Sequence, residues 1–252
     1  SPDRNVMQQA YEVRVFRDGR SVWRTGRVES QNSVTVAYEG EPLASGTRYE
    51  WQVRVWDNRG RVSKWSERSS WLTGMMTPDE WQAEWILPAE QTDASPMLRK
   101  EFTLSKPVAS AVAYITSHGM YEAAINGAKV GNAHYAPGWT SYDKRLQYQT
   151  YDVTDMLQKG ANAFGLTLGR GWYLSLLGWS SGEHQIYDYN TMAAIAQIVI
   201  TYRDGTREVI ATDDTWKSST GEIVHSTIYD GETIDARLIQ HGWNKAGFDD
   251  SA

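Results

Sequence analysis

Short runs in which apolar and polar residues alternate recur along the sequence, and they limit the chain to folds built from β-strands. The run RYEWQVRVWD shows the pattern best, because Tyr49, Trp51, Val53 and Val55 fall on one face of an extended strand. A shift of register by one residue would bury three polar side chains in their place, so this strand is strongly specified. We therefore predict an all-β fold.

The predicted strands are separated by polar or glycine-containing turns. They are YEVRVF, SVTVAY, RYEWQVRVWD and SSWLTG in the first part of the chain, and MLRKEFTL, SAVAYITS, YEAAING, LQYQTYDV, AFGLTLG, AAIAQIVITYRDG and REVIATDDTW in the second. Asn126 and Gly127 predict a two-residue hairpin turn, because both tolerate the positive φ that it requires. RDGT at 203–206 predicts a second hairpin. VTDMLQKG is the one candidate helix, with Thr154 as its cap and Gly160 at its end.

The strand pattern is interrupted at TGMMTPDEWQAEW, where Thr77, Pro78 and Asp79 form a linker-like stretch. A chain of 252 residues is long enough for two ordinary domains, since single cores stop growing at about 250 residues. We therefore predict one β-sandwich over 1–77 and a larger one over 78–252.

The composition excludes several partners and chemistries. The net charge of −6 comes with no basic run, so we expect neither nucleic acid nor a membrane as a partner. No apolar stretch approaches the roughly 18 residues of a membrane span, and SPDRNVMQQAYEV lacks the pattern of a signal peptide. The absence of cysteine excludes disulfides, thiol catalysis and cysteine-bound zinc. The chain contains 12 Trp and 14 Tyr but only 4 Phe. Trp and Tyr carry an N–H or O–H group on an apolar ring, so this excess favours partly solvated surfaces.

The segment APGWTSYDKR combines the side chains that a sugar site needs. A sugar has an apolar face of C–H groups and an edge of hydroxyls, so it binds between a flat ring and polar partners. Trp139, Tyr142, Asp143 and Arg145 supply these types close together. The alternative is structural, with Trp139 plugging the end of a sandwich, Tyr142 capping it, and Asp143 paired with Arg145.

The segment GRGWYLSLLGWSSGEHQIYDYN is long, lacks periodicity and contains Arg170, Trp172, Tyr173, Trp179 and Tyr187. Loops of this length are usually functional or disordered, and the density of rings argues against disorder. The rings either contact a ligand or seat the loop on a neighbouring domain, because both uses give the same composition.

Three acidic residues in IYDGETIDAR, namely Asp230, Glu232 and Asp235, invite comparison with a glycosidase acid pair, whose carboxyls lie about 5 to 9.5 Å apart. Turn chemistry at Asp230, and pairing of Glu232 or Asp235 with Arg237, explain them equally well. Because they lie on a turn with no cleft, we predict that none of them is catalytic.

The first predicted domain resembles a fibronectin type III sandwich. The resemblance rests on YEVRVF, on the central YEWQVRVWD and on VSKWSE, in which Trp65 and Ser66 match the Trp-Ser pairs of such modules. It implies a β-sandwich over residues 1–77.

The second predicted domain resembles the N-terminal jelly-roll module of bacterial α-L-rhamnosidases. The resemblance runs from about Trp81 onward and rests on YITSHGMYEAAINGAKVGNAHYAPGWTSYDKRLQYQTYDVTDMLQKGANAFGLTLGRGWY, followed by DDTWKSSTGEIVHSTIYDGETIDAR. Parts of it are also similar to galactose-binding-like sandwiches. In such rhamnosidases a separate (α/α)6 barrel carries the catalytic carboxylates. The resemblance therefore implies a non-catalytic N-terminal fragment of a glycoside hydrolase, with no catalytic residue in this chain.

Some members of this jelly-roll family bind L-rhamnose through calcium, a hard cation that takes oxygen ligands and accepts vicinal hydroxyls. The resemblance implies the amide of Asn132 and the carbonyl of Pro137 as calcium ligands. The sequence departs from such a site because Glu90 and Asp93 are the nearest candidate carboxylates, and they reach it only if their loop folds over. His134 is interpreted as a surface or stacking residue. No other cofactor is expected.

We expect the second domain to recognise rhamnose-containing glycans, or to orient them for catalytic domains of the parent enzyme, in an exported protein. The predicted carbohydrate-binding residues, which supply rings and polar groups, are Asn132, Trp139, Tyr142, Asp143, Arg170, Trp172 and Tyr173. The alternative is a structural spacer without a ligand that docks against the rest of the parent. A third interpretation, an adhesion module, has less support because residues 1–78 offer no recognition loop.

Overall fold

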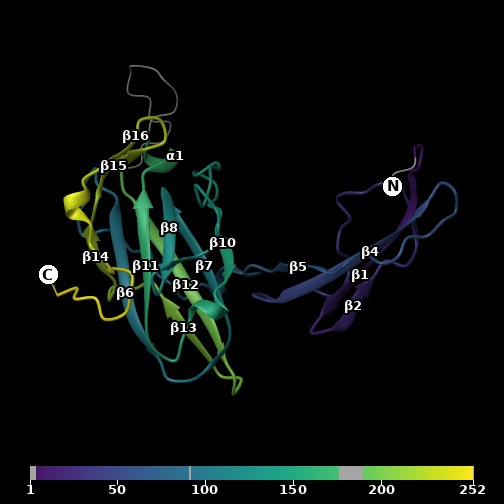
Figure 1. Ribbon diagram of the computed structural model, residues 1–252, viewed down its shortest axis with the longest axis horizontal. Helices are drawn as coiled ribbons and strands as arrows, with labels where there is room; N and C mark the ends of the chain where they lie inside the picture. The colour runs from purple at the N-terminus through teal and green to yellow at the C-terminus, as the bar shows by residue number, and fades with distance from the viewer. Residues whose placement is uncertain (1–3, 91, 176–189, 252) are drawn as a thin grey trace. The chain divides into compact units, whose positions relative to one another are not determined.

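The computed structural model describes residues 4–90, 92–175 and 190–251, and it confirms the all-β prediction (Figure 1). The chain divides into two compact units, Ser1–Pro78 and Asp79–Ala252, called unit 1 and unit 2 below. No helix among the described residues is long and apolar enough to span a membrane.

Unit 1 contains one antiparallel sheet with the order β2-β1-β4-β5, and β3 pairs with β1. The strands are β1 Gln8–Arg17, β2 Arg20–Arg24, β3 Val28–Glu29, β4 Arg48–Asp57 and β5 Ser69–Leu72. β4 has the bounds of the run RYEWQVRVWD, and Trp51, Val53 and Val55 line one pocket together, as the alternation predicts.

The predicted strand SVTVAY is wrong for this structure, because residues 33–38 form no strand. Thr35 has φ of 56°, in the left-handed region, which a β-branched residue rarely adopts and which breaks an extended run. Among the described residues, no strand pairs with this segment.

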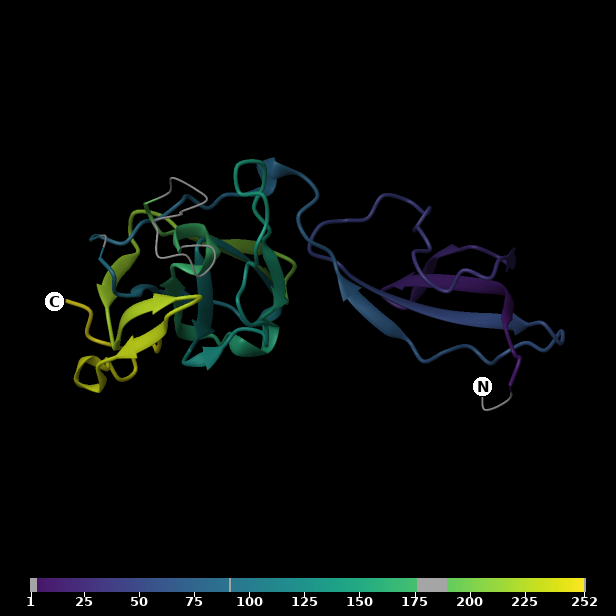
Figure 2. The same ribbon diagram turned by 90° about the horizontal axis from the view of Figure 1, so that it is seen from above.

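Unit 2 is built from two antiparallel sheets with the orders β10-β7-β12-β13 and β14-β6-β11-β8-β9, plus the hairpin β15-β16 (Figure 2). Its strands are β6 Pro96–Leu104, β7 Val108–His118, β8 Met120–Ile125, β9 Ala128–Lys129, β10 Gln149–Asp152, β11 Gly160–Gly169, β12 Ala193–Tyr202, β13 Arg207–Ala211, β14 Lys217–Thr220, β15 Ile223–Thr227 and β16 Gly231–Ile234. The last three of these were not predicted.

A contiguous core of buried apolar side chains fills unit 2 between its two sheets. Leu98 and Phe164 come from one sheet, Ile115 and Ile198 come from the other, and each is at most 1% exposed. The described members of this cluster run from Ile86 to Ile210, so all of them belong to unit 2.

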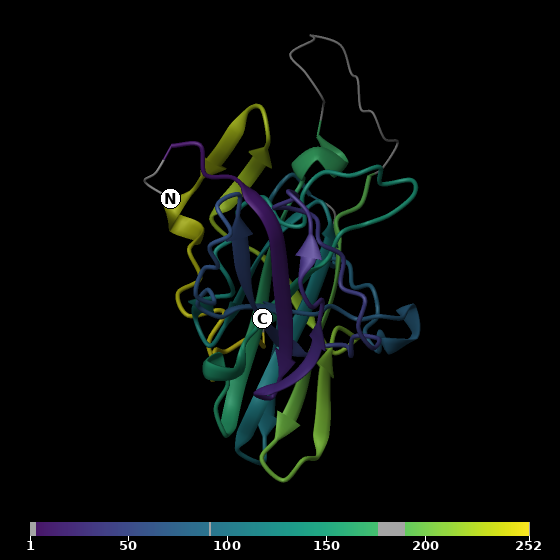
Figure 3. The same cartoon turned by 90° about the vertical axis from the view of Figure 1, so that its right-hand side faces the viewer.

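Two predicted hairpin turns are confirmed. Asn126 (φ 53°) and Gly127 (φ 85°) join β8 to β9, and Gly205 (φ 83°) lies in the turn between β12 and β13. Figure 3 shows that the β12–β13 turn lies at the end of unit 2 opposite to the β15–β16 hairpin.

The predicted helix at 153–160 is a single 3₁₀ turn, η2 Thr154–Met156, and its predicted cap is wrong. The hydroxyl of Thr154 donates to Asp152 (2.7 Å) and accepts from the backbone N–H of Ala111 (3.0 Å), so it ties the turn to β7. Gly160 opens β11. The other short helices are η1 Pro78–Glu80, α1 Gly171–Leu174 and η3 Ala236–Leu238.

Candidate functional site

One end of unit 2 brings together the loop after β9, the start of β8, helix α1 and the β15–β16 hairpin (Figure 1). Gly171 allows α1 to lie close to β8, because it has φ of 54° and a Cβ there would come within 2.6 Å of the Met120 side chain. The side chain of Trp172, the next residue, is therefore held near the start of β8.

Three rings form a surface that we call the ring platform: Tyr135, Trp139 and Trp172. The indoles of Trp139 and Trp172 are nearly parallel, with centroids 6.4 Å apart and an interplanar angle of 14°. The ring centroid of Tyr135 lies 6.0 Å from that of Trp172. Tyr135 is 63% exposed and Trp139 52% exposed, so the platform is open to solvent.

A second set of rings packs together in unit 2, and of these Trp85 remains exposed. Tyr173 stacks on His118 at 4.7 Å, Trp85 stacks on His118 at 4.2 Å, and Tyr142 meets Tyr173 edge-on at 5.1 Å. Tyr142 and Tyr173 are both 8% exposed and belong to the core. Burial lowers the pKa of His118 and raises the pKa of Tyr173.

A pocket of about 440 Å³ includes Tyr135 of the ring platform in its wall. Its carboxylates come from two different elements: Glu122 lies on β8, whereas Glu222 and Glu232 belong to the β15–β16 region. His134 completes the polar wall, and we call this site the acidic pocket. Glu122 pairs with Lys129, and Glu232 accepts a 3.4 Å hydrogen bond from Ser226.

The structure brings some predicted site residues together and separates others. Trp139 and Trp172 meet in the ring platform. Tyr142 donates to the carbonyl of Gly138 (3.2 Å) and is buried with Tyr173, so neither ring is exposed enough for a sugar to stack on it. The fold therefore uses these two side chains for packing.

The predicted polar contacts lie at the surface. Asn132 and Asp143 are exposed. Arg170 donates a 2.8 Å hydrogen bond to Asp93, so the loop containing Asp93 does fold over toward this end of unit 2. Trp179 and Tyr187, which the sequence also singled out, lie outside the described residues.

The donor set predicted for calcium does not fit a calcium ion. Pro137 is buried, and its carbonyl accepts a 3.1 Å hydrogen bond from the side chain of Gln149. Among residues 4–90, 92–175 and 190–251, no group of three or more acidic, histidine or cysteine side chains could hold a metal. Calcium needs several oxygens, usually with carboxylates among them, so we assign the ion no role at this site.

Two of the three acids singled out in IYDGETIDAR, Asp230 and Asp235, have structural partners. Asp235 accepts from both the backbone and the guanidinium of Arg237, and these bonds lower its pKa. Asp230 accepts from Thr227 at 3.0 Å, and Gly231 has the positive φ of a turn. Turn chemistry and surface pairing therefore explain Asp230 and Asp235.

Sequence reasoning missed the acidic pocket. Glu122 is an outward-facing residue of an alternating strand, and it resembles any solvated strand position. Only the fold brings it to the same pocket as Glu222 and Glu232, about 100 positions later in the chain. The rings of HYAPGW, which include Tyr135, are the signal that could have indicated this pocket.

These features describe an all-β chain of two units, the second a two-sheet sandwich with exposed rings and a polar pocket at one end. A family model described as the α-L-rhamnosidase N-terminal domain matches residues 106–252. A second, described as a Rha78A-like N-terminal immunoglobulin domain, matches residues 1–77, where the sequence had suggested fibronectin type III. The chain belongs to the family of α-L-rhamnosidase N-terminal domains.

The known proteins that are similar to this chain include several named as α-L-rhamnosidases. An α-L-rhamnosidase of Formosa agariphila is 36% identical over 97% of this chain and 28% of its own length. The structure of native α-L-rhamnosidase from Aspergillus terreus has a TM-score of 0.86 and 41% identity over 97% of this chain and 29% of its own. The Streptomyces avermitilis enzyme, solved with L-rhamnose, has a TM-score of 0.87 and 26% identity over 100% of this chain and 41% of its own. The chain therefore spans less than half the length of these relatives.

Proposed function

We propose that this chain is a non-catalytic N-terminal part of an α-L-rhamnosidase, and that unit 2 holds a rhamnose-containing glycan on the ring platform. The observation that carries this proposal is the nearly parallel pair of the exposed Trp139 and the half-buried Trp172, next to Tyr135, which lines the acidic pocket. L-Rhamnose offers a methyl group and a C–H face to the rings, and its hydroxyls suit carboxylate and imidazole partners.

In this proposal the two parts of the site have different tasks. The rings fix the apolar face of the sugar, while Glu122, Glu232 and His134 accept hydrogen bonds from its hydroxyls or donate to its oxygens. Hydrolysis belongs to catalytic domains outside these 252 residues. Binding on unit 2 raises the local glycan concentration at those domains, because the second encounter becomes intramolecular.

The test is titration of the chain with an L-rhamnose oligosaccharide, followed by isothermal calorimetry. Trp139→Ala should weaken binding about tenfold or more, which is about 1.4 kcal/mol. The same change should alter the free energy of unfolding by less than about 0.5 kcal/mol, because the side chain is 52% exposed. A loss of several kcal/mol in stability would instead identify Trp139 as a core residue.

Two control variants sharpen this test. Trp139→Phe keeps a flat ring and should retain most of the affinity. Trp85→Ala removes another exposed indole of unit 2, which stacks on His118 and is not part of the ring platform, and should leave affinity unchanged. Equal loss of affinity in Trp85→Ala and Trp139→Ala would contradict a site on the ring platform.

Thermal unfolding with L-rhamnose, measured once in calcium and once in chelator, tests separately whether sugar binding needs a metal ion. Ligand at about 100 times its dissociation constant should stabilise the native state by about 2.7 kcal/mol. We expect the same stabilisation in chelator, because the predicted donors lack the carboxylates that calcium prefers. A stabilisation lost in chelator would establish a metal-bridged site.

A spacer without a ligand is the second candidate function. It is favoured by apolar side chains on β16 and after it, where Ile234 is 59%, Leu238 48% and Ile239 41% exposed. Such residues suit packing against further domains of the parent enzyme. The absence of any heat of binding with rhamnose oligosaccharides would favour this function.

A further inference from the structure

The sheet of unit 1 has one apolar and one charged face. Cross-strand pairs on the apolar face join Tyr11 to Val55, Val13 to Val53, and Val15 to Trp51. Because these are directly opposed positions, their side chains form a continuous apolar surface. Antiparallel sheets with this pattern pack their apolar face against a second layer.

The opposite face of the sheet already has its partners. Glu12 accepts a 2.8 Å hydrogen bond from Arg54, and the guanidinium groups of Arg14 and Arg54 lie 4.3 and 4.8 Å from the ring centre of Trp65. Glu12 is only 6% exposed, so this face is already covered by its own side-chain contacts. A covering layer therefore belongs on the apolar face.

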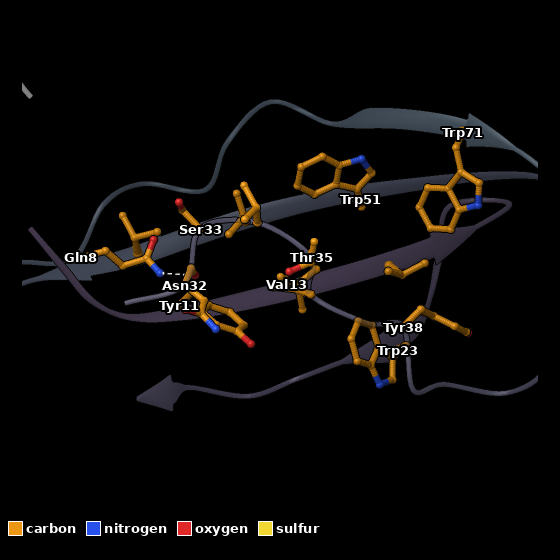
Figure 4. Close-up of a pocket in the computed structure, with 15 residues that line it drawn as sticks. Gln8, Tyr11, Val13, Trp23, Asn32, Ser33, Thr35, Tyr38, Trp51 and Trp71 are labelled. Atoms are coloured by element: carbon orange, nitrogen blue, oxygen red, sulfur yellow. Dashed lines mark hydrogen bonds between the residues drawn. The ribbon is translucent and has the colours of Figure 1, made fainter. Parts of the chain in front are cut away.

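The apolar face is only partly covered. A groove of about 440 Å³ runs over it, and Figure 4 shows Trp51 and Val13 on its floor with Thr35 of the loop beside them. Trp51 remains 37% exposed and Val34 70% exposed. In the described part of unit 1 the buried apolar residues are Ala10, Val15, Phe16 and Tyr49, far fewer than in unit 2.

Residues 33–38 lie along this groove and contribute Val34, Val36 and Tyr38 to its wall. Their sequence alternates as a strand would, yet within the described residues no backbone hydrogen bond pairs them with another segment. Because Thr35 has φ of 56°, these residues are not a continuous extended strand, and they cover the groove only in part.

We infer that a β-strand segment of the same polypeptide, outside these 252 residues, fills the groove beside residues 33–38. The segment would complete a two-sheet sandwich, the arrangement that defines the immunoglobulin fold of the family model matched by unit 1. The relatives are long enough to supply it, since this chain covers 28% of the Formosa agariphila protein.

The lining of the groove specifies the chemistry of this segment. None of its lining residues is charged, so the covering face of the segment must be apolar, with alternate side chains pointing inward. A sugar fits less well, because Trp23 and Tyr38 meet at 64° and offer no flat platform such as Trp139 and Trp172 do at 14°.

The test replaces Trp51 by the photo-crosslinker p-benzoyl-phenylalanine in the full-length polypeptide that contains this chain. Crosslinked peptides should map to one segment of the same polypeptide, outside residues 1–252. Trp56, on the same strand but the opposite face, is the matched control and should give no such crosslink. A crosslink from Trp51 to a second copy, to an added rhamnose oligosaccharide, or to nothing would overturn the inference.

A pair of neighbouring substitutions provides an independent readout in the same full-length protein. Val53→Glu places a charge in the groove, and it should raise the rate of proteolysis within unit 1 about tenfold or more, because an unpaired charge resists burial. Gln52→Glu adds the same charge on the opposite face, where Gln52 lies across from Arg14, and should change the rate less than about twofold. Equal rates in the two variants would mean that the groove stays open, against the inference.

Discussion

Asn162 shows how much of unit 2 depends on one buried polar side chain. It is 0% exposed, its amide nitrogen donates to the carbonyls of Gln158 (2.7 Å) and Gly160 (2.8 Å), and its oxygen accepts from Asn126 (2.8 Å) and from the Gln158 N–H (3.0 Å). Asn162→Ala leaves these groups unpaired, so we expect a loss of about 3 kcal/mol in urea unfolding. The exposed Asn132→Ala should change stability by less than about 0.5 kcal/mol, and similar losses in both would contradict this account.

His118 gives unit 2 a predictable response to pH. Burial holds its pKa below the ordinary value of 6.5, so the unfolded chain binds a proton that the native state resists. Stability is therefore retained above about pH 6.5 and falls as the pH decreases below that value. His118→Phe keeps a ring between Trp85 and Tyr173 without a titrating group. Between pH 7.5 and pH 5.5, the melting temperature should fall more in the unsubstituted chain than in His118→Phe. An equal fall in both would show that His118 is not the cause.

Among the elements, β11 carries the contact that holds the segment after η3 against unit 2. A Cβ at Gly165 would meet the Trp243 ring at 2.6 Å, and the neighbouring Arg99 donates to the carbonyl of Trp243 (2.8 Å). Gly165→Ala should therefore displace Trp243 and cost about 1 to 3 kcal/mol. Gly169→Ala on the same strand meets only atoms at 3.9 Å and should be tolerated. Hydrogen exchange of residues 240–251 reports the displacement, and unchanged exchange would contradict it.

The elements also show which features of the fold local pattern could predict. β4 was predictable because alternation and a paired partner strand agree, whereas residues 33–38 carry the same alternation without a partner and stay a loop. The ring platform was predictable in part, since Trp139 and Trp172 lie in ring-rich segments. Burial of Tyr142 and Tyr173, and the convergence of Glu122 with Glu232, depend on contacts distant in sequence that composition does not encode.

The whole molecule should unfold in two steps, because its two units bury very different amounts of apolar surface. Unit 2 contains a contiguous core, whereas the buried apolar residues of unit 1 number only a few and its groove leaves Trp51 37% exposed. On heating the 252-residue chain, we expect unit 1 to unfold first, and limited proteolysis at that temperature should release an intact fragment beginning near Asp79.

Added L-rhamnose assigns the two steps. If the sugar binds unit 2, the second calorimetric transition should move to higher temperature while the first stays in place, since a ligand stabilises only the unit whose native state binds it. A single transition would show that the two units unfold cooperatively, contrary to this prediction. Movement of the first transition alone would place the sugar on unit 1, against the ring platform.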